Sequence, residues 1–470
     1  MTTAHPTASE ATPGTALGAA PETTAATAPE TCPGAAPATH PQADTQAHPT
    51  TNAPAHPEPD APACPVAPEA VAFPFPHSSY RGPAPGYSRL RAEEPVARVP
   101  VATGGHTWVV TGYAEARAAL SDPRLSRAAF YRADAPEFPG LLKAPPEMIA
   151  SMDPPEHTRL RKLVTKAFTV RRVERLRPRI QELVDGFLDA MAAGGDSADL
   201  VAALSSPLPI TVICELLGVP ADDQEQFGLW ARQFASVTGD PERAREGAGR
   251  LAGYMAQMIA VKREEPADDL LSALIAARDE DDRLSEQELI VFGYTLLGAG
   301  FDTTACQLAN SVLALIAHHP EQWRRLCEHP EEVPAAVEEL LRAVNLFATD
   351  TTGFPRLATE DVEIGGVTVP RGEPVFIVLS SANRDPALVA DPDRLDLRRT
   401  DSRHLSFGHG IHRCLGAPLA RLELTIALDG LVRRFPGLRL AVPESDLVWH
   451  PGDVNHNLAA LPVTWAAPAH

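Results

Sequence analysis

One cysteine near the end of the chain has a sequence context that suggests chemistry. In the stretch FGHGIHRCLG, residues 407–416, Cys414 stands among three glycines and two histidines. The residues from Leu415 onward have helical spacing, so we expect Cys414 to lie where a loop becomes a helix. The partial positive charge and free N–H groups of a helix N-terminus stabilise a thiolate. Cys414 is therefore expected to be a ligand or a nucleophile.

Four interpretations of this cysteine compete. A zinc site could combine it with nearby histidines, but structural zinc sites usually need a second, distant pair of ligands, which we do not find. The histidines concerned are His404, His409 and His412. A nucleophilic cysteine with a histidine base leaves the glycines without a role, and a buried structural cysteine is the default for a lone thiol. A haem bound by Cys414 explains the glycines, which let backbone approach a flat macrocycle closely.

The stretch resembles the cysteine loop of the cytochrome P450 family of haem-thiolate monooxygenases. The resemblance implies that Cys414 is the axial ligand of the iron of haem b. The loop residues that would surround the cofactor are Phe407, Gly408, Gly410, His412 and Gly416. The resemblance spans about residues 75 to 465. It implies a mainly α fold with small β-sheets, in which the haem lies between a long central helix and the cysteine-loop helix.

The longest expected helix covers residues 285 to 319. Ser285 and Glu288 make a capping box at its start, and Pro320 follows its end. At its centre, GAGFDTTA places an acid and two threonines among apolar residues. Such polar groups are costly unless they have a function or face water, although a helix kink would also account for them.

This central stretch resembles the oxygen-binding helix of the same family. The resemblance implies that Ala299 and Gly300 belong to the groove above the iron, and that Asp302 and Thr303 are catalytic residues that assist proton delivery. A haem-binding sensor or carrier would use the same cysteine but would not need this acid and threonine. Their presence favours oxygen activation.

Two further sets of residues match family positions. Glu339 and Arg342, in EELLR, are three residues apart and share a helix face, a spacing that is common by itself. The resemblance makes them a brace of the haem-binding core, completed by Arg399, with Arg398 as the other candidate. It also implies that four cationic or hydrogen-bonding side chains bind the two haem propionates. These are His157, Arg161, Arg356 and His412.

Composition limits the class of protein. The chain has 470 residues and a formal net charge of -20, which argues against a nucleic-acid partner. Residues 1–70 contain no Lys, Arg, Phe, Trp or Tyr, so we expect a disordered tail before a single domain over 71–470. We find no signal peptide, no membrane span and no cysteine framework. These observations predict a cytoplasmic, monomeric protein that does not bind membranes.

The rest of the domain is expected to be helical with short strands. Two strands flank a Gly-Gly turn near residue 104, and a proline-rich loop covers residues 128–151. Helices are expected at 155–168, 171–193 and 207–217, and apolar residues recur with helical periodicity over 222–264.

The resemblance implies an enzyme that activates O2 with electrons from a ferredoxin and its reductase. We expect hydroxylation or epoxidation of a medium-to-large, natural-product-like small molecule. Oxidative coupling or rearrangement without oxygen insertion is the alternative, because it would use the same motifs. Substrate contacts are expected from the loop at 128–151, the central helix and the segment after Arg342. The candidates are Phe138, Leu141, Leu296, Ala299, Phe347 and Asp350.

Overall fold

The computed structural model describes most of the chain from residue 72 to residue 465. The described residues are 72–76, 78–132, 134–135, 138, 144–165, 168–235, 241–281, 284–348 and 355–465. All of them belong to the second of two units into which the chain divides, Val66–His470. The predicted disordered tail, residues 1–70, lies outside the described residues.

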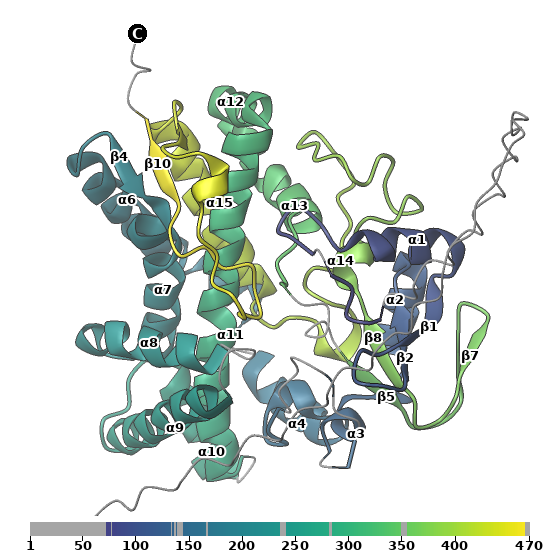
Figure 1. Cartoon of the computed structure of the whole chain (residues 1–470). Helices are drawn as coiled ribbons and strands as arrows, with labels where there is room; N and C mark the ends of the chain where they lie inside the picture. The colour runs from purple at the N-terminus through teal and green to yellow at the C-terminus, as the bar shows by residue number, and fades with distance from the viewer. Residues whose placement is uncertain are drawn as a thin grey trace, which may run out of the picture. The chain divides into compact units, whose positions relative to one another are not determined.

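A long helix, α11 (Glu286–Leu313), runs through the helical part of this unit (Figure 1). It begins as predicted, because the Ser285 side chain accepts a hydrogen bond from the N–H of Glu288 and the Glu288 side chain bonds back. One π-helical turn, Ala314–His318, extends it before α12 (Pro320–Glu328) begins. The stretch Glu286–His318 is long and apolar enough to cross a bilayer, but most of it is buried as the core helix of this unit.

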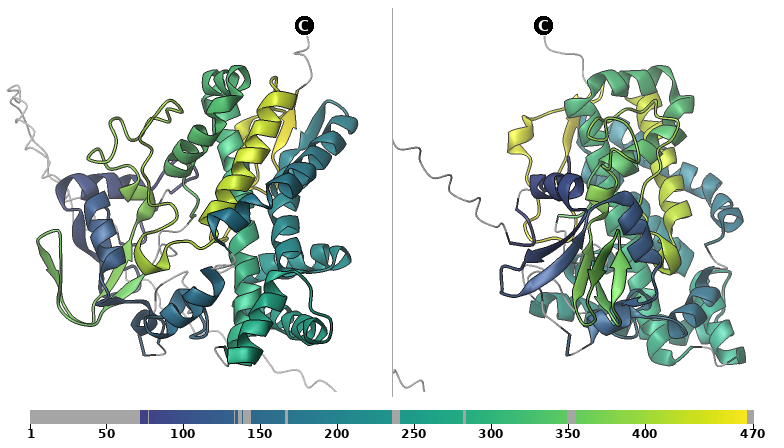
Figure 2. Two further views of the ribbon diagram at one scale, coloured as in Figure 1. Left: turned by 180° about the vertical axis from the view of Figure 1, so that it is seen from behind. Right: turned by 90° about the vertical axis from the view of Figure 1, so that its right-hand side faces the viewer.

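Further helices pack around α11 or beside the sheets (Figure 2). The longer ones are α6 (Arg177–Ala193), α7 (Pro207–Leu217), α8 (Gln224–Ala235), α9 (Pro241–Glu264), α10 (Leu270–Asp281), α13 (Val333–Ala343) and α15 (Ala417–Arg434). The shorter ones are α1 (Pro85–Glu93), α2 (Tyr113–Ser121), α3 (Arg127–Tyr131), α4 (Glu156–Thr165), α5 (Val170–Glu174) and α14 (Leu379–Ala382).

Two predicted helical segments are each divided in the structure. The segment 171–193 consists of α5 and α6, and Pro178 stands in the first turn of α6, where its missing N–H costs nothing. The periodic run over 222–264 consists of α8 and α9, and α9 begins at Pro241. Periodicity located the helices, and proline set their boundaries.

Three small sheets accompany the helices. The largest has the strand order β1-β2-β8-β5-β3, with β2 and β8 parallel and the other pairs antiparallel. Its strands are β1 (Val96–Pro100), β2 (His106–Val110), β8 (Pro374–Ile377), β5 (Arg356–Ala358) and β3 (Leu125–Ser126). A second sheet joins β4 (Ser197–Asp199), β10 (Pro462–Thr464) and β9 (Arg439–Leu440), and a hairpin pairs β6 (Val362–Ile364) with β7 (Val367–Val369). The predicted mainly α class with small β-sheets is confirmed.

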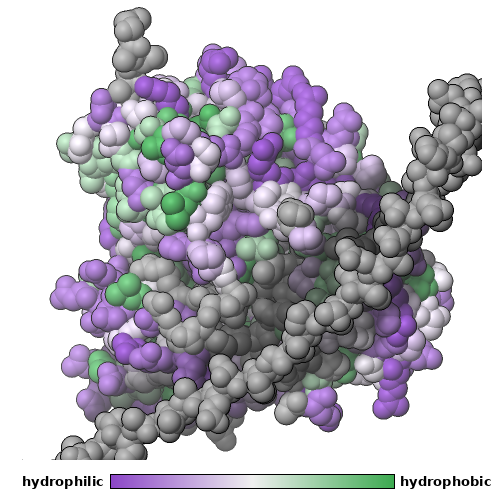
Figure 3. Space-filling view, in the orientation of Figure 1, coloured by the Kyte–Doolittle hydropathy of each residue, from purple (hydrophilic) through white to green (hydrophobic). Residues whose placement is uncertain are grey.

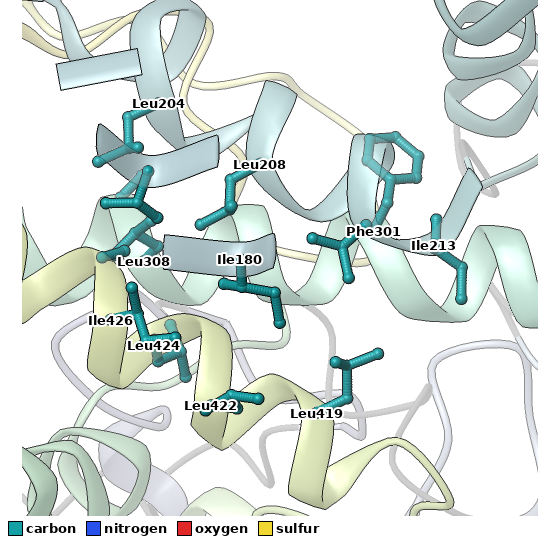
Figure 4. Packing of buried hydrophobic residues seen from close by; sticks show 14 of the residues in the cluster. Ile180, Leu204, Leu208, Ile213, Phe301, Leu308, Leu419, Leu422, Leu424 and Ile426 are labelled. Atoms are coloured by element: carbon teal, nitrogen blue, oxygen red, sulfur yellow. The ribbon is translucent and has the colours of Figure 1, made fainter. Parts of the chain in front are cut away.

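The largest hydrophobic core lies between the helices. Figure 4 shows leucine and isoleucine side chains of α15 on one side of α11, near Leu308, and Phe301 of α11 with Leu208 of α7 on the other side. Each fully buried large apolar side chain contributes roughly 1.5–3 kcal/mol to folding. The outer face is different, because hydrophilic residues predominate and hydrophobic ones are scattered among them (Figure 3). This packing fixes α11 and α15 relative to each other.

A buried ion pair connects α13 to the coil before the cysteine loop. The guanidinium of Arg342 contacts Glu339 at 2.8 Å, and both side chains are fully buried. Arg342 also donates to the carbonyls of Asn383 and Pro392, at 3.0 and 2.8 Å. Arg399 donates to the same Glu339 carboxylate at 3.1 Å. The buried charges are thus hydrogen-bonded on several sides, which such charges require.

Adjacent arginines allow a test of this brace. Arg399 is 14% exposed and contacts buried Glu339, whereas Arg398 is 61% exposed and contacts Asp396. We expect Arg399→Ala to lower the free energy of unfolding by about 1–3 kcal/mol, because it removes a hydrogen bond to a buried charge. Arg398→Ala should change it by less than about 0.5 kcal/mol. Chemical denaturation measures both values, and equal losses would contradict a special role for Arg399.

Candidate functional site

The cysteine loop owes its shape to two glycines. Gly408 and Gly410 have φ of 68° and 70°, a left-handed conformation that favours glycine. A Cβ on Gly410 would lie 2.5 Å from the carbonyl oxygen of Leu120, so the loop is seated on the end of α2. The N–H of Cys414 donates to the carbonyl of Phe407 at 2.8 Å and closes the loop. Helix α15 begins at Ala417, two residues later than predicted.

Cys414 is positioned to present its sulfur at the start of α15. The residue is exposed to solvent, yet the protein packed around the sulfur raises the pKa of its thiol. Hydrogen bonds from the N–H groups of Gly416 and Ala417 act in the opposite direction, as does the charge of Arg161. These bonds stabilise a thiolate, the form in which cysteine binds iron.

The zinc interpretation finds no support in the described part of the chain. No group of three His, Cys, Asp or Glu side chains comes together there in a way that could hold a metal ion. His404 contacts Glu338 at 3.2 Å, and the His412 ring lies against His157, with 4.3 Å between the ring centroids. These histidines therefore have other partners.

A group of basic side chains gathers beside the loop. His157 and Arg161 come from α4, Arg356 from β5 and His412 from the loop itself. Burial and the charges of Arg127 and Arg356 lower the pKa of His412 to about 2. Burial and the charge of Arg161 lower the pKa of His157 to about 4. Both imidazoles are therefore kept neutral by their burial and by the positive charges of the neighbouring arginines.

Arg127 belongs to this group, and sequence reasoning missed it. The register of β3 and β5 pairs Ser126 with Leu357, which brings the next residue, Arg127, beside Arg356. Both arginines are buried, at 8% and 2% exposure, and burial together with Arg127 lowers the pKa of Arg356. Only the strand register predicts this proximity, and the register of two- and three-residue strands is not readable from the sequence.

The basic group fits a haem. Like charges crowded in a low-dielectric region are unfavourable unless an anion compensates them. The two propionates of haem would supply that anion and hydrogen-bond acceptors. Nδ1 of His157 is buried and has no partner among the described residues, so it is available as a donor or acceptor. Haem b would supply oxygen chemistry here, with Cys414 as its ligand.

One face of α11 is open while most of its centre and C-terminal half is buried. Leu296 and Thr303 are half-buried and Ala299 is exposed, and their spacing puts all three on one face. The Thr303 hydroxyl donates to the carbonyl of Ala299 at 2.8 Å. Gly300 also lies against α7, because a Cβ there would be 3.4 Å from Ile213, an ordinary contact distance. Its predicted place in the groove above the iron stays a prediction.

Asp302 has partners that the sequence did not indicate. Its carboxylate is 7% exposed and accepts hydrogen bonds from Asn455 at 2.6 Å and from Asn457 at 3.2 Å. Both asparagines lie in the segment before β10, about 150 residues away. No local pattern marks them, since single asparagines in a polar coil are common.

The predicted substrate contacts are distributed unevenly. Phe138 packs in a hydrophobic core, with its ring centroid 5.8 Å from that of Phe130 and 4.7 Å from that of Phe376. Phe347 is half-buried and pairs with Asn455 in an isolated β-bridge. Leu141 and Asp350 lie outside the described residues.

Two glycines of the loop permit a matched test. Gly410→Ala should destabilise the protein, with at least about 1–2 kcal/mol from the left-handed backbone alone, because its Cβ also meets Leu120. Gly416→Ala should fold normally, since φ is −79° and no protein atom lies within 4 Å of the added Cβ. Thermal unfolding and the haem-to-protein ratio distinguish them. Equal stability of the two variants would show that the loop is not held as described.

Comparisons with known proteins agree with this site. The Cytochrome P450 family model matches residues 241–445. Mycinamicin IV hydroxylase/epoxidase of Micromonospora griseorubida is 46% identical over 84% of this chain and 99% of its own length. Nocardicin C N-oxygenase of Nocardia uniformis subsp. tsuyamanensis is 48% identical over 81% of this chain and 95% of its own. A solved cytochrome P450 with biaryl coupling reactivity, P450mel 107F1, superposes with a TM-score of 0.76 at 40% identity, covering 83% of this chain and 98% of that one. The chain therefore belongs to the cytochrome P450 family of haem-b monooxygenases.

Proposed function

We propose that this cytochrome P450 hydroxylates or epoxidises a medium-to-large natural product in secondary metabolism. The overall reaction consumes O2, two electrons and two protons, places one oxygen atom in the substrate and releases the other as water. The observation that carries the proposal is the open face of α11, where Thr303 stands beside the buried acid Asp302. An acid and a hydroxyl at this place suit proton delivery, which a haem carrier would not require.

The remaining site residues would bind and orient the cofactor. Cys414 would ligate the iron, with its charge stabilised by the N–H groups that point at its sulfur. The basic group would bind the propionates: His157, Arg161, Arg356 and His412 from the prediction, and Arg127 from the structure. Phe407 would support the loop, because its ring stacks under the guanidinium of Arg421, 4.5 Å from the ring centroid.

The substrate class rests on the relatives. The names of the two curated relatives describe oxygenation of mycinamicin IV and of nocardicin C, both complex natural products. The open face of α11 offers apolar contact through Leu296 and Ala299. A screen of mycinamicin IV and nocardicin C for a substrate-induced shift of the haem spectrum is the direct test of this class.

Electrons would come from a ferredoxin and its reductase. A surface hollow of about 380 Å³ beside the cysteine loop has basic residues, Arg161 and Lys162, and the exposed side chain of Ile411 on its walls. This suits a small acidic partner. Arg421, Arg433 and Arg434 contribute less, because each is paired with a nearby carboxylate.

Two further properties complete the proposal. We expect a monomer, because the most exposed large apolar side chains of the described residues are few and lie on separate elements. They are Val170, Leu229, Val261, Ile411 and Val448. A cytoplasmic location is consistent with the chain's acidic surface and its similarity to bacterial relatives.

Oxidative coupling is the second candidate. The observation in its favour is the likeness to the solved structure whose title names biaryl coupling reactivity. Coupling joins two rings with loss of two electrons and two protons and leaves no oxygen in the product. Product analysis with ¹⁸O2 separates the candidates, because only oxygenation introduces the label.

The thiolate ligand can be tested by spectroscopy. The reduced protein with carbon monoxide should show the strongly red-shifted Soret band of thiolate-ligated haem, and Cys414→Ala should abolish it. Cys327→Ala, which removes a half-buried thiol elsewhere in the fold, should retain it. An unchanged band in Cys414→Ala, or no haem in well-folded wild type, would contradict the assignment.

The role of Thr303 can be tested by measuring how many of the electrons from NADPH end in hydrogen peroxide. Thr303→Ala removes the hydroxyl on the open face of α11, and Thr304→Ala is its control, because Thr304 is buried and bonds the Gly300 carbonyl at 3.2 Å. We expect Thr303→Ala to raise the yield of hydrogen peroxide by at least about tenfold, a smaller effect than the roughly 10²–10⁴-fold that a general acid–base group contributes. Peroxide yield per NADPH consumed measures this, and equal yields in the two variants would exclude the role.

A further inference from the structure

The segment before β10 is attached to one stripe of α11. Asp302, Cys306 and Asn310 follow one another at intervals of four residues, so they lie along one side of the helix. Cys306 and Asn310 both bond the carbonyl of His456, at 3.2 and 2.9 Å. Asp302, one turn before Cys306, instead accepts hydrogen bonds from the side chains of Asn455 and Asn457, which flank His456. The stripe therefore contacts the backbone of this segment through Cys306 and Asn310, and its side chains through Asp302.

The described side-chain hydrogen bonds to Asp302 come from asparagine amide groups. Asn455 and Asn457 each present an amide N–H group, and together they reach both oxygens of the carboxylate. Asn457 also donates to Asp453 at 3.0 Å, so one amide group bridges two carboxylates. Hydrogen bonds to a buried carboxylate are charge-assisted and fix its orientation. Asn455 is itself 4% exposed, so its own rotamer is restricted by packing.

The same segment is attached to the chain that follows α13. The N–H of His456 donates to the carbonyl of Leu346, and the N–H of Ala348 donates to the carbonyl of Val454, both at 2.9 Å. Phe347, between these two residues, is a candidate substrate contact and pairs with Asn455. The backbone of Asn455 thus pairs with a candidate substrate-binding segment, and its side chain bonds the buried acid of α11.

We propose that Asn455 and Asn457 are positioning residues that hold the Asp302 carboxylate in the orientation required for proton delivery and link that orientation to the segment 346–348. The inference rests on the proposed function, in which Asp302 delivers protons. The asparagines act only through Asp302. Loss of either asparagine side chain should therefore affect the steps that need protons from the protein. It should not affect a reaction whose oxidant supplies the protons.

The test uses Asn455→Ala with Asn310→Ala as its matched control. Asn310 is fully buried and bonds the same segment from the same stripe, but it does not contact Asp302 in any described interaction. Both variants should lower the melting temperature. Only Asn455→Ala should raise, severalfold, the fraction of NADPH electrons recovered as hydrogen peroxide. The assay uses a plant-type ferredoxin with its reductase and styrene as the probe.

Three readouts separate positioning from general loosening. Asn455→Ala should show a larger solvent deuterium isotope effect on NADPH-driven styrene epoxidation than wild type. Epoxidation driven by added hydrogen peroxide, which supplies its own oxygen, electrons and protons, should keep wild-type rates. A crystal structure of the variant should show the Asp302 carboxylate in a new orientation. If Asn455→Ala does not fold, Asn457→Ala should give the same pattern more weakly.

Several outcomes would overturn the inference. Wild-type peroxide yield in Asn455→Ala, or an equal rise in Asn310→Ala, would show that the segment serves only stability. Asp302→Asn distinguishes this failure from that of the proposed function. If Asp302→Asn raises the peroxide yield and Asn455→Ala does not, only the positioning role is wrong. If Asp302→Asn leaves the yield unchanged, the proton-delivery role and the inference fail together.

Discussion

The crowding of buried basic side chains beside the cysteine loop is the constraint on which this structure depends. Residues from four separate segments meet there: the start of α3, helix α4, strand β5 and the loop itself. Burial and the charges of the neighbouring arginines lower the pKa values of His157 and His412, to about 4 and about 2. Repulsion between such groups is unfavourable unless an anion lies among them. A dianionic cofactor relieves it, so binding of haem and completion of the fold are expected to be coupled.

Much of the fold could be predicted because its determinants are local. The capping box at Ser285 and the proline at position 320 set the limits of the central helical stretch without reference to the rest of the chain. The left-handed glycines at 408 and 410 similarly specify the loop that presents Cys414. The sequence motif was readable for this reason, since its spacing encodes backbone shape as well as chemistry.

The features that the sequence did not indicate share a physical cause, which is dependence on long-range packing. Phe138 is a large apolar residue in a loop, as pocket residues often are, but its ring packs against the rings of Phe130 and Phe376. Gly300 belongs to the motif, and the structure places it against Ile213 of α7. Arg127 joins the basic group only because β3 pairs with β5. Strand register and helix contacts decide these positions, and neither has a signature within a few residues of sequence.

Adjacent residues of α11 show how one helix can separate two tasks. Thr303 lies on the open face with Ala299, while Asp302 lies about 100° around the helix on the stripe that contacts the segment before β10. A hydroxyl on the open face can approach a reacting group, and an acid on the buried stripe can be held by donors that never meet the substrate. The acid's orientation then depends on residues about 150 positions away. Under the proposed role of Asp302, substitutions in the segment before β10 would change proton delivery in this protein without any change in the motif around Cys414 or in the central helix.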